Sequence, residues 1–353
     1  MDSIIGILIV LPPLIFFHEL GHYFAAIKSG VYVEVFSIGF GPELFGYTDK
    51  RGTRWKFSPF LLGGYVKMKG ETLTDNQSND IKSEKDSFIN VNLSSKIFIL
   101  FSGPFANLVL GVLLISFFYS YNGRYETPAI ISEVLENSAA EIAGLKSRDI
   151  IKEINNINIT NFDDVKKIVQ ENSEKKLTFK ILRGNNEKLI DVFPEKLLLE
   201  NSIIVGRIGV KAILPILSKK TFFKSIYFGF FDSIQLSISW LNGLSQIKWF
   251  SILSLEKDKD IMGPIGIAKL SGDIVGKGFM PLLYFMAFMS INLGLINLLP
   301  IPPLDGGHIV IYLYQLIFKK PLPMIVQSFV MRLGIILLLL LMILVTIPEL
   351  GLY

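Results

Sequence analysis

Four long runs of apolar residues divide this chain of 353 residues. Each is close to the roughly 20 residues that a helix needs to cross the hydrocarbon core of a bilayer. The runs are Ile4–Ile27, Ile97–Tyr121, Phe279–Leu299 and Leu333–Ile347. The fourth is almost purely Leu, Ile and Val, whereas the first and third contain polar groups that a lipid-facing helix would not tolerate. The pattern predicts a polytopic α-helical membrane protein with about four transmembrane helices.

A fifth apolar stretch, Ile226–Leu253, is interrupted by polar residues and has two tryptophans near its middle and end. The interruptions are Asp232, Gln235, Asn242 and Gln246. This pattern favours a helix, or a pair of helices, lying in the membrane interface over another span.

Two further regions have the patterns of folded β structure. Residues Val31–Met68 alternate apolar, Gly and aromatic positions around a turn at Thr48–Gly52, which predicts a hairpin or small sheet. The apolar content of Phe57–Val66 suggests that this element dips toward the membrane. Residues Ala129–Phe193 predict a small α+β domain, whose expected strands are Ile130–Val134, Asp149–Ile154, Leu177–Leu182 and Leu189–Phe193, and whose expected helices are Ser138–Ala143 and Phe162–Glu171.

Basic residues indicate the orientation in the membrane. They are frequent between the first two spans, and Lys319, Lys320 and Arg332 follow the third, while neither end of the chain carries Lys or Arg outside its span. By the positive-inside rule these loops are cytosolic. Both termini and the segment Arg124–Lys219 then lie outside the cytosol. Met1 and Asp2 supply no basic start for a secretion signal, so we expect a retained first helix.

Composition narrows the chemistry. Half of the residues are apolar and the formal net charge is only +4, so nothing indicates a nucleic-acid surface. The chain has no cysteine, which excludes disulfides, thiolate metal sites and a cysteine nucleophile. It has three histidines, His18, His22 and His308.

The first span contains His18-Glu19-Leu20-Gly21-His22. Positions i and i+4 share one face of a helix, so the two imidazoles converge on one point and suit a zinc ion. Glu19 is placed to act on water as a general base and then as an acid. In a soluble helix the motif is often an ordinary surface patch, but three ionisable residues within a membrane helix favour a functional site. A helix rising 1.5 Å per residue places His18 roughly 22 Å beyond Ser3, toward the cytosolic third of the bilayer.

A zinc enzyme of this kind needs a third protein ligand. The candidates are His308 and a carboxylate, and Asp305 is the one acidic residue between Asp273 and Glu349. The orientation puts Asp305 at the depth of His18, which favours it as the ligand. The alternative is a residue that caps a helix starting near His308. We expect His308 to lie behind the ligands or to face solvent.

These motifs together resemble the site-2 proteases, the intramembrane zinc metalloproteases, and specifically the bacterial regulator-of-sigma-E protease group. The matching segments, in order, are His18–His22, Leu62–Met68 (LGGYVKM), Ser102-Gly103-Pro104 with Asn107, Ala139–Asn155, Gly263–Gly266 and Asn297–Gly306. They extend over nearly the whole chain. The segment Ala139–Asn155 resembles part of a PDZ domain.

The resemblance implies one Zn²⁺ held by His18, His22 and Asp305, with Glu19 as the catalytic acid and base. It implies that a membrane-associated β element containing Gly63, Gly64 and Tyr65 receives the substrate as a strand, and that Asn297 binds substrate backbone or an oxyanion. Asn107 is expected to support packing of the second span. The expected substrates are single-pass membrane proteins already trimmed by another protease, or remnants of signal peptides. The expected location is a bacterial inner membrane.

The resemblance also implies four parts. Residues 1–122 hold two transmembrane helices, the HExxH motif and the β element; residues 125–198 form an inserted, extracytosolic PDZ domain; residues 199–278 are a linker with interfacial helices; and residues 279–353 hold the last two transmembrane helices. The sigma-E regulator group has two PDZ domains and this chain has room for one, so an anti-sigma substrate is not assumed.

Two other classes are weighed against a protease. A scaffold that binds partners through its PDZ domain would have no need of the intact set of two His, Glu and Asp. A metal transporter usually shows repeat symmetry and several sites along its pore, and no repeat is detectable here. An assay for peptide-bond cleavage would distinguish a protease from a scaffold or a metal transporter.

Overall fold

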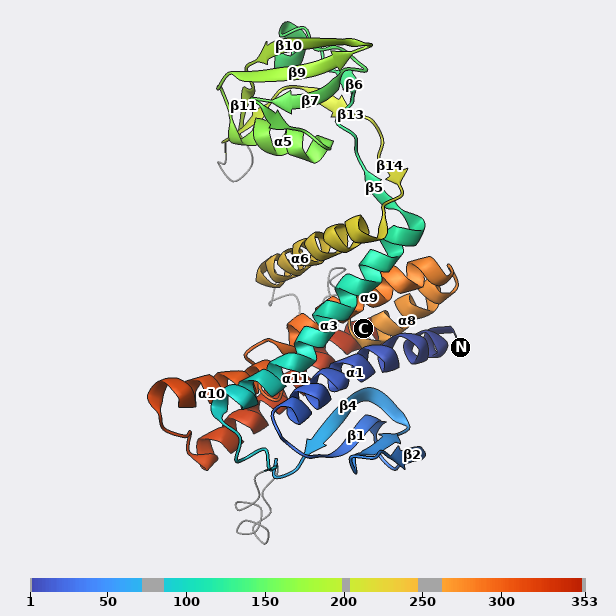
Figure 1. The fold of residues 1–353 in the computed structure, drawn as a ribbon, viewed down its shortest axis with the longest axis vertical. Coiled ribbons are helices and arrows are strands. Elements are labelled where there is room, and N and C mark those ends of the chain that lie inside the picture. The colour runs from blue at the N-terminus through green and yellow to red at the C-terminus, as the bar shows by residue number, and fades with distance from the viewer. Residues whose placement is uncertain (1, 72–85, 199–203, 247–261, 351–353) are drawn as a thin grey trace. The chain divides into compact units, whose positions relative to one another are not determined.

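The computed structural model describes residues 2–71, 86–198, 204–246 and 262–350. Their contacts divide into two compact units, residues 1–120 with 221–353, and residues 121–220. Figure 1 labels the elements of both units. The helices are α1 (Asp2–Lys28), α3 (Leu93–Asn122), α4 (Ala139–Ile142), α5 (Phe162–Glu171), α6 (Phe222–Gln246), α8 (Pro264–Val275), α9 (Phe279–Asn297), α10 (Asp305–Phe318) and α11 (Met324–Leu350).

Four of these helices, α1, α3, α9 and α11, are long and apolar enough to cross a membrane. They coincide with the four runs that the hydropathy pattern indicates, which confirms that expectation for the helices. Helix α1 continues through Pro12 and Pro13. The apolar stretch from Ile226 forms α6, which is not among the candidate spans of the described chain. Residues 247–253 of that stretch lie outside the described residues.

The helices approach one another where small residues remove side-chain bulk, as is common for helices packed in membranes. Gly6 of α1 lies against the backbone of Ser271 and Gly272 in α8. Gly21 of α1 lies against the Ser102 carbonyl of α3. These contacts hold α1 between α8 and α3, so the first helix is at the centre of its unit.

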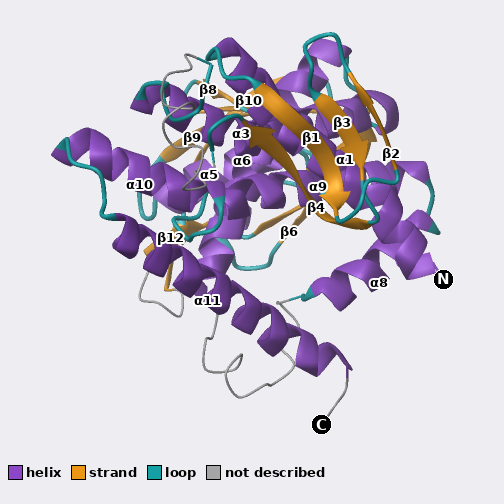
Figure 2. Cartoon of the chain, turned by 90° about the horizontal axis from the view of Figure 1, so that it is seen from below, coloured by secondary structure: helices purple, strands orange, loops and turns teal. Residues whose placement is uncertain are grey.

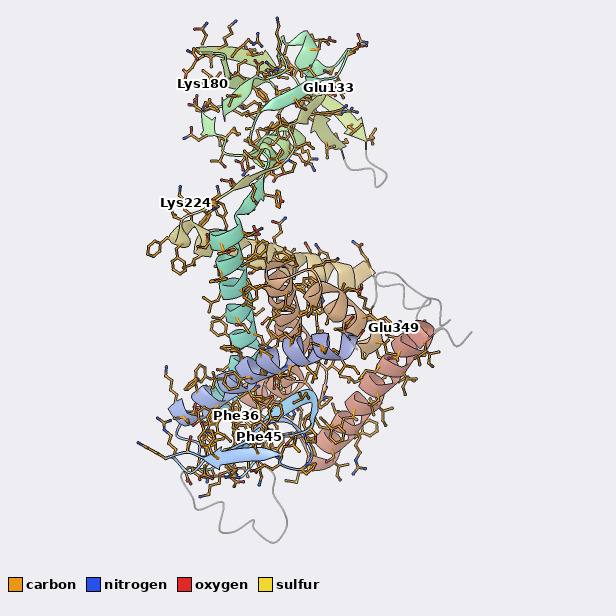
Figure 3. All side chains as sticks on the ribbon, turned by 90° about the vertical axis from the view of Figure 1, so that its right-hand side faces the viewer. Phe36, Phe45, Glu133, Lys180, Lys224 and Glu349 are labelled. Atoms are coloured by element: carbon orange, nitrogen blue, oxygen red, sulfur yellow. The ribbon has the colours of Figure 1, made fainter. Side chains whose placement is uncertain are left out.

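A four-stranded sheet packs on α1, as Figure 2 shows. Its strands are β1 (Val33–Phe40), β2 (Phe45–Thr48), β3 (Arg54–Phe57) and β4 (Phe60–Met68). The order is β2-β3-β1-β4, with β1 parallel to β3 and antiparallel to β4. The predicted turn at Thr48–Gly52 joins β2 to β3. Phe36 is buried against Tyr23 of α1, whereas Phe45 is exposed (Figure 3). Strand β4 therefore forms one edge of the described sheet, beside the helix that carries the HExxH motif.

The second unit is an α+β fold with its own core. Its main sheet has the order β10-β9-β7-β8, and α5 begins with a capping box between Asn161 and Asp164. Ile131, Ile154, Leu177, Phe179 and Ile181 are completely buried in the core. The strands are β5 (Arg124–Glu126), β6 (Ile131–Val134), β7 (Ile150–Ile154), β8 (Ile157–Asn158), β9 (Leu177–Arg183), β10 (Asn186–Val192), β11 (Glu195–Leu198), β12 (Ile204–Arg207), β13 (Val210–Ala212) and β14 (Ile216–Ser218).

The compact unit includes residues 121–220, and the predicted PDZ domain of residues 125–198 lies within it. Strand β13 pairs with β6, and β14 pairs with β5. Strands β13 and β14 therefore return to the first strands of the unit, while β12 pairs with β11. These pairings provide hydrogen-bond partners for the backbone groups of β5 and β6.

Candidate metal centre

Helix α1 presents His18 and His22 on one face. Their side chains are buried, with 8% and 6% of the residue surface exposed. Their Nε2 atoms lie 3.2 Å apart. The separation of four residues gives this approach directly, since i and i+4 side chains stack along a helix.

Asp305 arrives from a distant part of the chain. It is the first residue of α10, just after the proline-rich turn that follows α9. Gly306 lies against the carbonyls of Leu298 and Leu299, so the chain doubles back tightly here and a side chain at this position would collide with that backbone. This turn places Asp305 Oδ2 3.2 Å from His18 Nε2 and 3.5 Å from His22 Nε2.

The three ligand-type atoms fit a zinc ion. In a tetrahedral site with bonds of about 2.0–2.1 Å, neighbouring ligand atoms are separated by about 3.3 Å. The observed separations are 3.2, 3.2 and 3.5 Å. Two imidazole nitrogens and one carboxylate oxygen form a donor set suited to Zn²⁺, and three protein ligands leave a fourth position for water or substrate. Within the described residues, His18, His22 and Asp305 are the group of such side chains close enough to share one ion. His308 is not a member, and burial lowers the pKa of its imidazole.

The remaining ring nitrogens have partners on α3. His22 Nδ1 is 2.9 Å from the carbonyl oxygen of Ile99. His18 Nδ1 is 3.2 Å from the side-chain amide of Asn107. Gly103 lies between these two positions, and a Cβ there would overlap the His22 imidazole. Helix α3 therefore forms the wall behind both histidines.

Glu19 lies beside the cluster with 8% of its surface exposed. Strand β4 passes directly over it, because a Cβ at Gly64 would lie 2.9 Å from Glu19 Cγ and 2.8 Å from Ile15 Cγ2. Only glycine lets the strand come this close. The carboxylate is thereby confined between the strand and the three converging side chains.

The structure separates the predicted substrate-binding residues. Gly64 faces α1, whereas Gly63 and Tyr65 face Phe40 on the other side of β4. This follows from the alternation of side chains along a strand. Asn297, the last residue of α9, has its Nδ2 3.4 Å from His18 Nε2. Gly64 and Asn297 therefore lie beside the cluster of His18, His22 and Asp305. Gly63 and Tyr65 lie on the opposite face of β4.

Sequence reasoning missed the contacts that Asn107 and the Ile99 carbonyl make with the histidines. Asn107 was expected to support helix packing, but its side chain reaches a histidine of the HExxH motif 89 positions away. The available signal was a carboxamide inside an apolar span, where a polar group needs a partner. The Ile99 carbonyl gives no signal in the sequence, since every residue has one.

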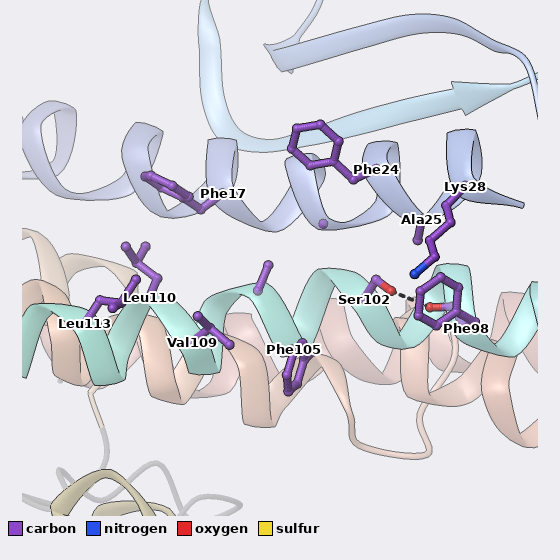
Figure 4. A pocket seen from close by; sticks show the side chains of 12 residues that line it. Phe17, Phe24, Ala25, Lys28, Phe98, Ser102, Phe105, Val109, Leu110 and Leu113 are labelled. Carbon is purple, nitrogen blue, oxygen red and sulfur yellow. Dashed lines mark hydrogen bonds between the residues drawn. The ribbon is translucent and has the colours of Figure 1, made fainter. Parts of the chain in front are cut away.

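A separate apolar groove runs along α1 and α3 (Figure 4). Phe17 and Phe24 of α1 and Phe105 of α3 line it, with Lys28 at one end. The Ser102 hydroxyl on its wall donates to the Phe98 carbonyl of its own helix. Lys28 is the single ionisable residue that lines this groove, so the lining does not contain an acid and a base that could act together in catalysis.

The HExxH helix, the third ligand from a distant turn and the buried glutamate define the class as a zinc-dependent peptidase. The comparisons agree: the chain belongs to peptidase family M50, the site-2 protease family, whose model matches residues 6–341. The chain is accordingly a zinc metalloprotease.

Relatives in three bacteria are similar over almost their whole length. A Rickettsia conorii protein is 36% identical over 97% of both chains. A Campylobacter jejuni protein is 34% identical over 97% of this chain and 92% of its own. A Brucella suis protein is 32% identical over 96% of this chain and 92% of its own. All three carry the name "Putative zinc metalloprotease".

Among solved structures, the PDZ domain of an SdrC-like protein from Listeria monocytogenes is similar to part of this chain. The match covers 26% of this chain and 90% of that domain, with 13% sequence identity and a TM-score of 0.22.

Proposed function

We propose that this zinc metalloprotease hydrolyses peptide bonds within or near the membrane-spanning segments of single-pass membrane proteins. The observation that carries the proposal is the position of His18, Glu19 and His22 within the long apolar helix α1, beside an edge strand, with Asp305 brought to them at the start of α10. A protease that acts on soluble loops has no need to place its centre inside such a helix, where ionisable groups are costly.

The chain's own residues supply most of the chemistry. His18, His22 and Asp305 would hold one zinc ion, which supplies Lewis acidity that activates water and polarises the peptide carbonyl. Glu19 takes the proton from the attacking water and delivers it to the leaving amine. The burial of Glu19 excludes bulk water around this transfer. Asn297 is placed to donate its amide to substrate oxygen near the site.

Strand β4 provides the means of presenting a membrane segment. A transmembrane helix keeps its amides in internal hydrogen bonds, so it must unwind before a peptide bond can be attacked. Pairing the unwound segment with β4 replaces those bonds and directs the chain toward Glu19. Because Gly64 has no side chain, such a strand can lie within reach of the carboxylate.

The remaining expectations complete the proposal. The four apolar helices cross a bacterial inner membrane, with the metal centre toward the cytosol and the unit of residues 121–220 on the other side. That unit is a PDZ domain, which binds a partner or controls access. The substrates are membrane proteins trimmed by an earlier protease, or remnants of signal peptides.

A cleavage assay in proteoliposomes tests this function. The substrates are single-pass segments prepared in pairs, one with a Gly-Pro step in the membrane segment and one with Leu at both positions. We expect cleavage within the segment, located by mass spectrometry, and a rate at least about tenfold higher for the Gly-Pro member, because unwinding costs less there. A zinc chelator should stop the reaction. Cleavage confined to soluble flanks, or equal rates for both members, would contradict the proposal.

A further inference from the structure

Asn107 is buried behind the metal centre, on the α3 side of His18. Its side chain is completely buried, with 0% of the residue surface exposed. Its backbone carbonyl accepts a hydrogen bond of 2.7 Å from the Ser290 hydroxyl of α9. The side-chain amide lies 3.2 Å from His18 Nδ1. The bond from Ser290 reaches only the backbone of Asn107, so the functional contact of its side chain is the one with the His18 ring.

The two histidines use their ring nitrogens in the same way. Each Nε2 points into the cluster, where it lies within 3.5 Å of Asp305 Oδ2. In His22 the other nitrogen, Nδ1, faces a backbone carbonyl, which can only accept, so Nδ1 carries the hydrogen and Nε2 keeps its lone pair. His18 must have the same tautomer to bind a metal through Nε2. Its Nδ1–H then requires an acceptor.

The amide of Asn107 contains the needed acceptor. A half turn about its last bond exchanges oxygen and nitrogen without moving any other atom, so either can face the ring. When the nitrogen faces His18, Oδ1 is buried and no donor among the described residues reaches it. When the oxygen faces His18, it accepts the Nδ1–H. We infer that Asn107 is a positioning residue whose amide oxygen fixes the tautomer and ring orientation of His18 for zinc.

Asn297 does not fill this role, although it also approaches His18. Its Nδ2 is 3.5 Å from Nδ1 and 3.4 Å from Nε2 of the same ring. An atom almost equidistant from both nitrogens lies along the bond direction of neither, so it makes no good hydrogen bond to the ring. The two asparagines therefore have different roles. Asn107 orients the His18 imidazole, and the side-chain amide of Asn297 is available to bind substrate.

The inference rests on the zinc site of the proposed function and is tested by metal affinity, which needs no substrate. The full-length chain in detergent is titrated with Zn²⁺ against a competing chelator, for wild type, Asn107→Leu and Asn107→Asp. Loss of an outer partner of a metal-bound histidine typically weakens binding by about 10–100-fold, so we expect this loss for Leu. Asp supplies only acceptor oxygens and should bind within about threefold of wild type or more tightly. Ser290→Ala is the control, because it removes the bond to the Asn107 backbone and leaves the side chain in place.

A spectroscopic readout separates positioning from general loosening. With Co²⁺ in place of Zn²⁺, the visible absorption of Asn107→Leu should shift, while that of Ser290→Ala should match wild type. The inference is overturned if Leu binds Zn²⁺ as tightly as wild type. It is also overturned if Asp binds Zn²⁺ at least about tenfold more weakly than wild type, since the side chain would then act as a donor. This comparison with wild type stays decisive even where Leu prevents folding. A wild-type chain that binds no zinc would refute the metal site itself.

Discussion

At the scale of single residues, the metal centre depends on positions that carry no chemistry. Gly103 of α3 lies so close to the His22 ring that any side chain there would overlap it. His22 cannot move away freely, because its Nδ1 is hydrogen-bonded to the carbonyl of Ile99, which is on α3 like Gly103. The absence of one Cβ therefore sets how close α3 comes to α1, and with it the position of the His22 imidazole.

This gives the first prediction. Gly103→Ala should displace the His22 imidazole and weaken zinc binding by at least about tenfold, as expected for a misplaced ligand. Gly243→Ala in α6 is the matched control, since nothing lies within 4 Å of a Cβ there. Zinc content after dialysis of both purified variants checks it. Full zinc occupancy in Gly103→Ala would show that the helices adjust without cost to the site.

The sequence predicted the cluster of His18, His22 and Asp305 for a physical reason. The separation of His18 and His22 matches one turn of a helix, and a carboxylate is rare enough in the last apolar third of the chain for Asp305 to stand out. The contact of Asn107 with His18 joins positions 89 apart and depends on how two helices cross. No local pattern encodes that crossing, so the role of Asn107 required the fold.

At the scale of elements, α11 is the least covered of the four long helices, with 6% of its most apolar window buried. One of its anchors is Glu349, near its end (Figure 3). The Glu349 Oε1 accepts hydrogen bonds from the backbone N–H groups of Gly263, at 2.8 Å, and Gly266, at 3.1 Å. These groups belong to the first turn of α8, whose free N–H groups need acceptors. The side chain thus closes α8 and ties α11 to it.

The second prediction concerns this tie. Glu349→Ala should leave two N–H groups without their acceptor and destabilise the chain by about 1–3 kcal/mol. Glu349→Gln keeps an oxygen in the same place and should lose much less. Thermal unfolding in detergent compares the two variants. Equal midpoints for Ala and Gln would mean that the carboxylate does not hold the helices together.

Elements were predicted well where hydrophobic patterns were long. The four long helices and strands β6, β7, β9 and β10 follow from runs of apolar or alternating residues. Strands β13 and β14 were missed because each has three residues, too few to show an alternation. They form through pairing with β6 and β5, which lie about 80 to 90 positions earlier. Such pairing is tertiary information, which a local sequence pattern does not contain.

At the scale of the whole molecule, the chain combines two units with separate cores. In the unit of residues 121–220, Asp149 is completely buried and accepts two bonds of 2.7 Å from the Arg183 guanidinium. It also accepts from the Lys146 backbone N–H. This ion pair joins the start of β7 to the end of β9, within that unit alone.

The third prediction follows from this division. Asp149→Ala should destabilise its own unit by about 2–3 kcal/mol, since it leaves a charged partner and an N–H group unsatisfied. Lys211→Ala, which breaks an exposed pair with Glu133, should cost less than about 1 kcal/mol. Hydrogen exchange of the full chain, read by mass spectrometry, measures both. The zinc content of Asp149→Ala should equal that of wild type, and a parallel loss of zinc would contradict independent cores.

The central claim is that Glu19 performs the proton transfers at a zinc ion held by three other residues. The most direct measurement pairs zinc stoichiometry with cleavage of a membrane-segment substrate in the same preparation, for wild type, Glu19→Gln and Asp305→Asn. We expect Glu19→Gln to keep one zinc per chain and lose at least about a thousandfold in cleavage rate, because the acid and base is gone while the ligands remain. Asp305→Asn should lose both. Substantial cleavage by zinc-loaded Glu19→Gln would contradict the mechanism, and full zinc binding by Asp305→Asn would contradict the ligand set.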